Sequence, residues 1–177
     1  MYEGQVLPNP PGPPGHPWDQ NSDGKLDCWK ATVMNYDPLS ETGYCQQYGA
    51  TSPPCSRGHI HKGQDVVAPC GSVVRAPGRG KVVNIFYGSG SGNSLLMQVE
   101  DGMYVAYFHL AEVDETLQSL FNAEKKPRIY PGQVVGTVGN TGCGSCGCHL
   151  HVQVQTVQDT TTDISNTLDP KVYFGNC

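Results

Sequence analysis

The sequence has no long hydrophobic run and no cluster of basic residues. No stretch approaches the ~20 consecutive apolar residues that a helix needs to cross a bilayer, so we expect no membrane span. The 11 lysines and arginines are scattered, and 16 acidic residues outnumber them to give a net charge of -5. We therefore expect neither nucleic acid nor an anionic membrane as a partner. The first residues also lack the charged and apolar regions of a signal peptide, so Met1 is expected to begin a trimmed chain.

Hydrophobic residues make up only 37% of the chain, whereas glycine and proline are abundant, with 22 and 14 residues. This composition favours short strands joined by many turns and argues against an all-α fold. A length of 177 residues allows one compact domain with its own core and is short for two. We expect a Pro-, Gly- and Cys-rich N-terminal extension over residues 1–58, a single domain over residues 59–177, and a monomer.

Short β-rich segments bounded by glycine and proline follow one another from residue 64 onward. They predict a mainly β fold built as an antiparallel β-sheet assembly. Apolar residues at helical spacing between Glu112 and Ala123 predict one short helix there. The segment from Leu168 to Phe174 is expected to form an edge strand or a docked tail. The predicted strands lie in the runs DVVAP, SVVRAP, GKVVNIFYG, SLLMQVEDG, MYVAYFHL, VVGTVG and HLHVQVQTV.

Eight cysteines, an even number in a small chain, indicate an oxidising compartment in which cysteine pairs persist as disulfides. We therefore expect a secreted protein, extracellular or periplasmic, with every cysteine oxidised. The expected pairings are Cys28 with Cys70, Cys45 with Cys55, and Cys177 with a cysteine of the loop CGSCGC.

The loop CGSCGC also has an alternative interpretation as a metal site. Its cysteines, Cys143, Cys146 and Cys148, crowd into six residues just before His149. Thiolate sites usually need a second Cys or His pair at tetrahedral spacing. Disulfide formation remains the expectation for this loop.

The segment DQNSDGKLD has the pattern of a calcium-binding loop. Gly24 falls at the sharp turn of such a loop, but Lys30 occupies the twelfth position, where a bidentate acid is needed. Calcium binding would therefore require Asp37 or a backbone carbonyl to complete the shell, and the alternative is a polar Asx-rich turn. The candidate ligands are Asp19, Asn21, Asp23 and Asp27.

Histidines and one aspartate carry the strongest functional signal. His149 and His151 lie two apart in the strand-like run HLHVQVQ, so both side chains leave the same face of the strand. Upstream, HKGQD places His61 and Asp65 around Gly63, and we expect the glycine to bend the backbone so that both side chains converge on one ion.

A further histidine, His109 in YVAYFHL, is expected to end another strand and to face the same groove. Taken alone, a single histidine of this kind is more often structural than catalytic. Two histidines with one carboxylate, however, are a common catalytic zinc set that leaves a fourth position open. The combination therefore predicts a metal-dependent active site.

An ordered set of motifs resembles the lysostaphin- or LytM-type metallopeptidases, family M23, over about two thirds of the chain. Such an ordered set is far more specific than any one motif. The motifs are H-x-G-x-D from His61 to Asp65, AP-x-G-x-V from Ala76 to Val82, GN at Gly92 and Asn93, Y-x-HL from Tyr107 to Leu110, PGQVVGTVGNTG from Pro131 to Gly142, HLHVQV from His149 to Val154, and DP at Asp169 and Pro170.

The resemblance implies a LytM-type fold with a long groove and a bound zinc ion. It implies that zinc is held by His61, Asp65 and His151, and that His109 and His149 have catalytic roles. The family pattern takes the histidine two residues before the glycine of H-x-G-x-D, so His59 is read as a groove-wall or surface residue. The implied substrate is a peptide cross-link of bacterial peptidoglycan, or alternatively a Gly-rich protein such as elastin.

The chain also departs from the family pattern. Gly147 and Cys148 stand where the family usually has Gly-Pro, and the loop before them is one residue longer. The Cys-rich N-terminal segment resembles vertebrate secreted chemotaxin-like relatives, which keep the zinc ligands but lack a catalytic histidine. A secreted zinc-containing binding module without catalysis is therefore the alternative function, although both His109 and His149 are present here.

Overall fold

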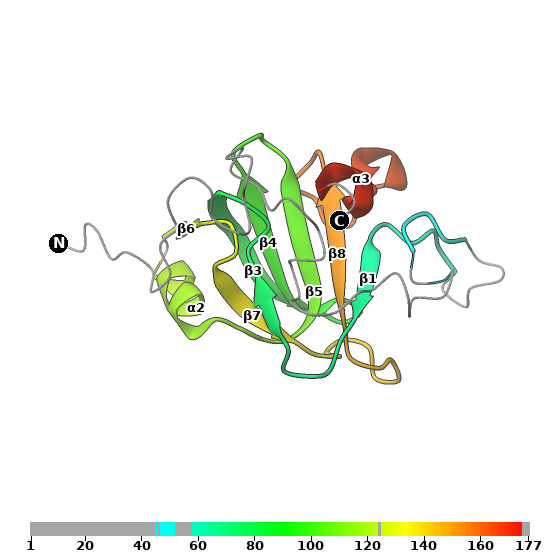
Figure 1. Cartoon of the computed structure of the whole chain (residues 1–177), viewed down its shortest axis with the longest axis horizontal. Helices are drawn as coiled ribbons and strands as arrows, with labels where there is room; N and C mark the ends of the chain where they lie inside the picture. Colours follow the sequence, from blue (N-terminus) through cyan, green and yellow to red (C-terminus); the bar gives the residue numbers. More distant parts are fainter. Residues whose placement is uncertain (1–44, 46, 52–57, 124, 175–177) are drawn as a thin grey trace.

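The structure is a computed structural model that describes residues 45, 47–51, 58–123 and 125–174 (Figure 1). Its centre is one sheet whose neighbouring strands are antiparallel throughout. The predicted mainly β, antiparallel fold is confirmed. The strands are β1 (Gln64–Val67), β2 (Val73–Arg75), β3 (Gly80–Gly88), β4 (Gly92–Val99), β5 (Tyr104–Val113), β6 (Arg128–Ile129), β7 (Val134–Val138), β8 (His149–Gln155) and β9 (Thr167–Leu168).

The order of the main path is β1-β8-β5-β4-β3-β6, with β2 and β9 attached through β7 and β8. Strand β8, late in the chain, lies between β1 and β5, and this crossover brings residues from distant parts of the sequence together (Figure 1). β5 pairs with β8 as far as Phe108 and with β7 from Leu110 onward. His109 is therefore at the point where β5 changes partner, rather than at the end of a strand as predicted.

Side chains along β8 alternate between a face that packs on the core and a face that carries the histidines, here called the functional face. Leu150, Val152 and Val154 are fully buried in the hydrophobic core, which they share with the buried residues of β3, β4 and β5. Because successive side chains of a strand point to opposite faces, His149 and His151 emerge on the other face. The core thus fixes the strand that carries both histidines.

Helix α2 (Glu115–Asn122) confirms the predicted helix in a shorter form. Asp114 caps its N-terminus by accepting a hydrogen bond from the Leu117 amide at 3.0 Å, which satisfies one of the unpaired donors of the first turn. Leu117 is fully buried, so the helix is held by its apolar side. Val113, which the helical spacing had included, belongs to β5 instead.

The C-terminal segment combines both expected elements and adds a helix. Leu168 ends the short edge strand β9, and α3 (Pro170–Phe174) follows with Phe174 buried against the core. A 3₁₀ helix, Ile164–Asn166, precedes β9. Among the described residues, α3 is an α-helix that the prediction of one short helix did not include.

One disulfide ties the loop before β8 to the rest of the domain, and a second closes within that loop. Cys70 pairs with Cys148, and Cys143 pairs with Cys146. The loop cysteines are thus disulfide-bonded rather than a thiolate metal site. Cys70 follows β1 and Cys148 precedes β8, and these two strands are neighbours in the sheet, which explains why the two residues meet.

Two predicted pairings are wrong for this reason. Cys28 cannot pair with Cys70, because Cys70 is bonded to Cys148, and Cys177 cannot pair with a loop cysteine, because all of those have other partners. Cys45 is disulfide-bonded, and its pairing with Cys55, which lies outside the described residues, stays a prediction.

The candidate calcium ligands Asp19, Asn21, Asp23 and Asp27 lie outside the described residues, as does most of the extension over residues 1–58. The described part of that extension contacts the domain: the Gly49 amide donates to the His61 carbonyl, and the His61 amide donates to the Ala50 carbonyl. Among the described residues, no helix is both long enough and apolar enough to cross a membrane.

Candidate metal centre and active site

Three side chains that the sequence analysis nominated as ligands meet on the functional face. Asp65 on β1 and His151 on β8 are direct cross-strand partners. His61 lies in the segment that leads into β1. All three side chains are buried, with 1%, 3% and 7% of their residues' surface exposed for His61, Asp65 and His151. Burial of two imidazoles and a carboxylate together requires that they satisfy one another or share an ion.

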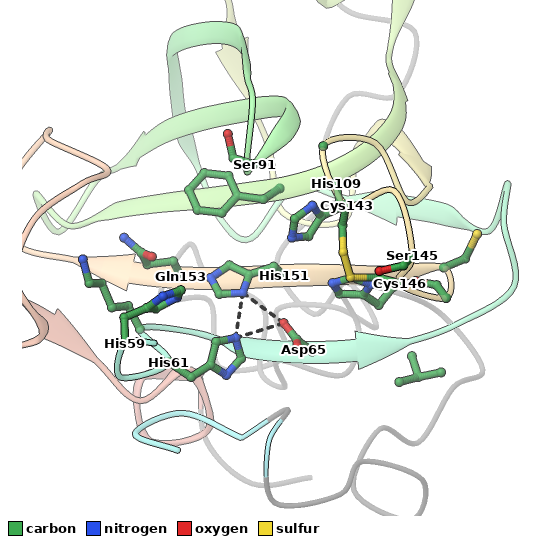
Figure 2. Close-up of a pocket in the computed structure, with 18 of the residues that line it drawn as sticks. His59, His61, Asp65, Ser91, His109, Cys143, Ser145, Cys146, His151 and Gln153 are labelled. Carbon is green, nitrogen blue, oxygen red and sulfur yellow. Dashed lines mark hydrogen bonds and ion pairs between the residues drawn. A yellow bond between two sulfur atoms is a disulfide. The ribbon is translucent and has the colours of Figure 1, made fainter. Parts of the chain in front are cut away.

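The ligand atoms of this cluster form a nearly equilateral triangle (Figure 2). His61 Nε2 lies 2.9 Å from His151 Nδ1 and 3.1 Å from Asp65 Oδ1, and His151 Nδ1 lies 2.9 Å from Asp65 Oδ1. Zinc bonds nitrogen and oxygen ligands at about 2.0–2.1 Å, so that adjacent ligands of a tetrahedral ion are about 3.3 Å apart. The triangle is of the size that surrounds such an ion.

A hydrogen bond on the side of the His61 ring away from the cluster determines its tautomer. Its Nδ1 lies 2.9 Å from the Gln47 carbonyl oxygen, which can only accept, so Nδ1 carries the proton and Nε2 presents a lone pair. This backing contact resembles the outer-shell bonds that orient metal-binding histidines. The chemistry of the donors therefore fits a divalent cation such as zinc.

The pKa values of His151 and Asp65 favour protonation states that can bind a cation. Burial lowers the pKa of His151 to about 4, against the opposing effect of Asp65, so its imidazole is neutral at neutral pH. Burial alone would raise the pKa of Asp65, but its hydrogen bonds to His151 and His61 outweigh that and hold the pKa well below its usual value. The set thus contains the neutral His151 imidazole and the ionised Asp65 carboxylate.

Gly63 has a different role from the predicted one. Its φ is not in the left-handed region, so a bend that only glycine allows is not the reason for its presence. A Cβ at this position would lie 2.5 Å from His151 Nε2 and would meet the Val152 carbonyl. The glycine leaves the space that the His151 ring occupies.

His109 and His149 lie beside the cluster. Their ring centroids are 4.6 Å apart, and that of His109 is 6.2 Å from that of His151. Nδ1 of His109 donates to the Thr141 carbonyl at 2.9 Å, and Nδ1 of His149 donates to the Gly147 carbonyl at 2.8 Å. Both rings are thereby assigned the tautomer whose Nε2 accepts a proton.

The backbone at His109 is itself unusual. It is the one non-glycine residue with positive φ, 63°, among the described residues. Such a conformation costs free energy and persists only where surrounding structure enforces it. The His109 amide donates to the Ser91 carbonyl at 2.8 Å. The next residue along, Gly92, packs so closely against residues 141–142 that a Cβ on Gly92 would overlap with Thr141.

The predicted groove is an open cavity of about 780 Å³. The ligand cluster, His109 and His149 line it, and Phe108 stacks on the His151 ring with centroids 5.2 Å apart. Cys143, Ser145 and Cys146 form one rim (Figure 2). His59 is exposed and also lines the cavity, in the wall or surface position predicted for it.

With this geometry in place, comparison with known proteins identifies the family. Residues 59–164 match the family described as Peptidase family M23. The chain belongs to this family of metallopeptidases. The M23 match contains the three residues of the ligand cluster and both further histidines.

Two curated relatives and one solved structure illustrate the likeness. Glycyl-glycine endopeptidase ALE-1 of Staphylococcus capitis is 31% identical over 130 residues, covering 72% of this chain and 33% of ALE-1. DD-carboxypeptidase/endopeptidase Mpg of Neisseria meningitidis is 29% identical over 123 residues, covering 69% of this chain and 26% of Mpg. The solution structure of lysostaphin shares 26% identity, with a TM-score of 0.62 over 86% of this chain and 54% of that one. The chain thus spans about a quarter to a third of the length of these curated relatives.

Sequence reasoning missed three contributors to the site. Gln47 fixes the His61 tautomer, Phe108 stacks on His151, and Thr141 holds His109. The motif GNTG, which contains Thr141, was a signal for the last of these. Gln47 acts through its backbone carbonyl, so no residue type could have signalled it.

Proposed function

We propose that this M23 domain is a zinc endopeptidase that hydrolyses peptide cross-links of bacterial peptidoglycan. The observation that carries the proposal is the buried triangle of His61 Nε2, Asp65 Oδ1 and His151 Nδ1 at 2.9–3.1 Å, with two further histidines beside it. The relatives ALE-1 and Mpg are both named as endopeptidases, which supports the same reaction class. Zinc bound by these three residues would polarise the scissile carbonyl and lower the pKa of a bound water to about 7.

His109 and His149 would handle the proton that hydrolysis transfers. The water oxygen adds to the carbonyl carbon, the C–N bond breaks, and one proton moves from the water to the departing amine. Since Nε2 of either histidine is the basic atom, one ring can accept that proton and the other can hydrogen-bond the oxyanion. Their assignment between these two tasks stays open.

Gln47 and Phe108, which contact the ligand histidines, would hold their rings in position. The Gln47 carbonyl would orient the His61 ring by accepting a hydrogen bond from its Nδ1, and stacking on Phe108 would keep the His151 ring in place. The open cavity admits an extended peptide across the sheet face. The two disulfides favour secretion into an oxidising compartment, extracellular or periplasmic, where a cell-wall peptide is accessible.

The test is digestion of purified peptidoglycans that differ in cross-bridge type, with elastin as a protein substrate beside them. Mass analysis of the fragments should show new amino and carboxyl termini within a wall cross-link. A zinc chelator should abolish the release and added zinc should restore it. If zinc-loaded protein released no fragment from any peptidoglycan, the proposal would be wrong; cleavage of elastin alone would assign the substrate to Gly-rich proteins.

A further inference from the structure

A second cavity, of about 450 Å³, lies at the opposite end of the sheet from the ligand strand β1. Its lining comes from the start of β3, the end of β4 and the turn after it, and residues 126 and 128 at β6. No residue lines both this cavity and the one that holds the histidines. Three of its lining residues are basic, namely Lys81, Lys126 and Arg128.

Strand register places the three basic side chains on one side. Lys81 on β3 and Arg128 on β6 are cross-strand partners, and their neighbours Val82 and Ile129 are buried. Alternation therefore directs Lys81 and Arg128 away from the core. Lys126 lies two residues before Arg128, and the backbone between them is held by a hydrogen bond from the Val82 amide to the Pro127 carbonyl.

This arrangement is electrostatically unfavourable in the absence of a partner. Like charges directly opposite in an antiparallel pair destabilise it. Glu100, the acidic residue in the lining, faces Arg79 at 3.9 Å. In the part of the chain that the structure describes, no ion pair joins a carboxylate to Lys81, Lys126 or Arg128. The fold thus brings Lys81 beside Lys126 and Arg128, which are already close in the sequence, in a chain of net charge -5.

We propose that this cleft binds a polyanion, through oxyanion groups spaced closely enough to contact Lys81, Lys126 and Arg128 together. A guanidinium binds an oxyanion through two parallel hydrogen bonds, and the two ammonium groups add charge without demanding one geometry. Binding here would be independent of the peptidase chemistry, because the cleft shares no residue with the histidine cavity.

The probes are dextran sulfate and poly-L-glutamate, with neutral dextran as the uncharged counterpart, titrated calorimetrically into the zinc-loaded full chain at low salt. Both charged polymers should bind, and the neutral polymer should not. Sulfate and carboxylate probes distinguish which oxyanion the cleft prefers. Amide chemical shifts should change around residues 80–81 and 126–129 rather than around residues 61–65 and 149–151.

Arg128→Gln and Lys171→Gln form a matched pair, since each removes one positive charge and Lys171 lies on α3, outside the lining. Arg128→Gln should weaken binding at least about fivefold and lower the salt slope by about one, as expected for one lost ionic contact. Lys171→Gln should change the affinity less than twofold, and both variants should cleave a soluble peptide at the unaltered rate. Absence of binding by both charged probes, or equal losses in the two variants, would overturn the proposal.

Discussion

At the scale of single residues, the geometry of the ligand cluster depends on how tightly each ligand side chain is packed and hydrogen-bonded. His151 is the clearest case, because it touches both other ligands, stacks on Phe108 and fills the space above Gly63. A side chain with this many fixed neighbours has little freedom to rearrange. Small changes beside it should therefore affect metal binding before they affect folding.

Gly63→Ala should weaken zinc binding about 10- to 100-fold, the usual range for disturbing the surroundings of a metal ligand. The added Cβ would lie 2.5 Å from His151 Nε2, so the ring must shift from the triangle. Gly144→Ala is the control, because a Cβ there meets no atom within 4 Å. Competition with a chromophoric chelator measures both affinities. Equal affinities in the two variants would contradict the role assigned to Gly63.

The metal-free protein should lose stability as the pH falls from about 6.5 toward 4. Burial lowers the pKa of His151 from 6.5 to about 4, so in this window the unfolded chain binds a proton at His151 that the folded chain does not. The stability that this group contributes is fully present above the higher value and is lost as the pH falls through the window. Asp65, whose pKa is also lowered, acts only below 3.8.

Urea unfolding of the metal-free protein at several pH values measures this effect. His151→Gln removes the titrating group and should flatten the slope between pH 6.5 and 4. If wild type and His151→Gln showed the same slope, the burial of a neutral His151 would not be the cause.

At the scale of elements, Thr141 links three segments around His109. Its carbonyl accepts from His109 Nδ1, and its hydroxyl accepts from the Asn93 amide at 2.9 Å and donates to the Leu110 carbonyl at 2.7 Å. The β4 start, the β5 partner change and the loop after β7 are thus fixed to one another. The His109 ring direction depends on this junction.

Thr141→Val keeps the side-chain shape but removes the hydroxyl, so it should lower kcat about tenfold, equivalent to ~1.4 kcal/mol of lost positioning. KM and zinc stoichiometry should change little, because neither the cavity walls nor the ligands move. Thr141→Ser retains the hydroxyl and should restore most of the turnover. Steady-state kinetics on a soluble peptide measure kcat and KM of both variants. If Thr141→Ser were as slow as Thr141→Val, the methyl group of Thr141, and not its hydroxyl, would be responsible for positioning His109.

Elements formed by local sequence were predictable, and those that depend on distant partners were not. Alternating apolar residues marked the strands, and the spacing of Leu117 and its neighbours marked α2. The partner of Cys70 was missed because the disulfide depends on β1 and β8 being neighbours in the sheet. Cys70 and Cys148 are 78 residues apart in the sequence, and no local pattern shows that their strands pair. The partner change of β5 at His109 was missed for the same reason.

At the scale of the whole molecule, one sheet serves two chemically different surfaces. The His and Asp side chains that the motifs nominated do converge, because β8 places His149 and His151 between β1 and β5. Lys81 also joins Lys126 and Arg128 near β3 and β6, but no motif marks these residues, and the pairing of β3 with β6 that brings them together could not be seen in the sequence. Motif order thus indicated which side chains converge, whereas their roles stay a prediction, and it gave no indication of the second cleft.

The central claim is that metal binding and proton transfer reside in different residues of one cavity. His61→Ala, Asp65→Ala and His151→Ala each remove a proposed ligand, so zinc content and cleavage should fall together. His109→Ala and His149→Ala leave the triangle whole and should keep near-stoichiometric zinc and normal folding. Their turnover should nevertheless fall by about 10² to 10⁴, the usual scale for a positioned proton-transfer group.

The most direct measurement is zinc content beside cross-link cleavage for these five variants, prepared in parallel. The account predicts two groups, one without zinc or activity and one with zinc but little activity. Zinc lost from His149→Ala and retained by His151→Ala would reverse the assignment within the H-x-H pair, and full activity of His109→Ala would contradict its proposed role in catalysis.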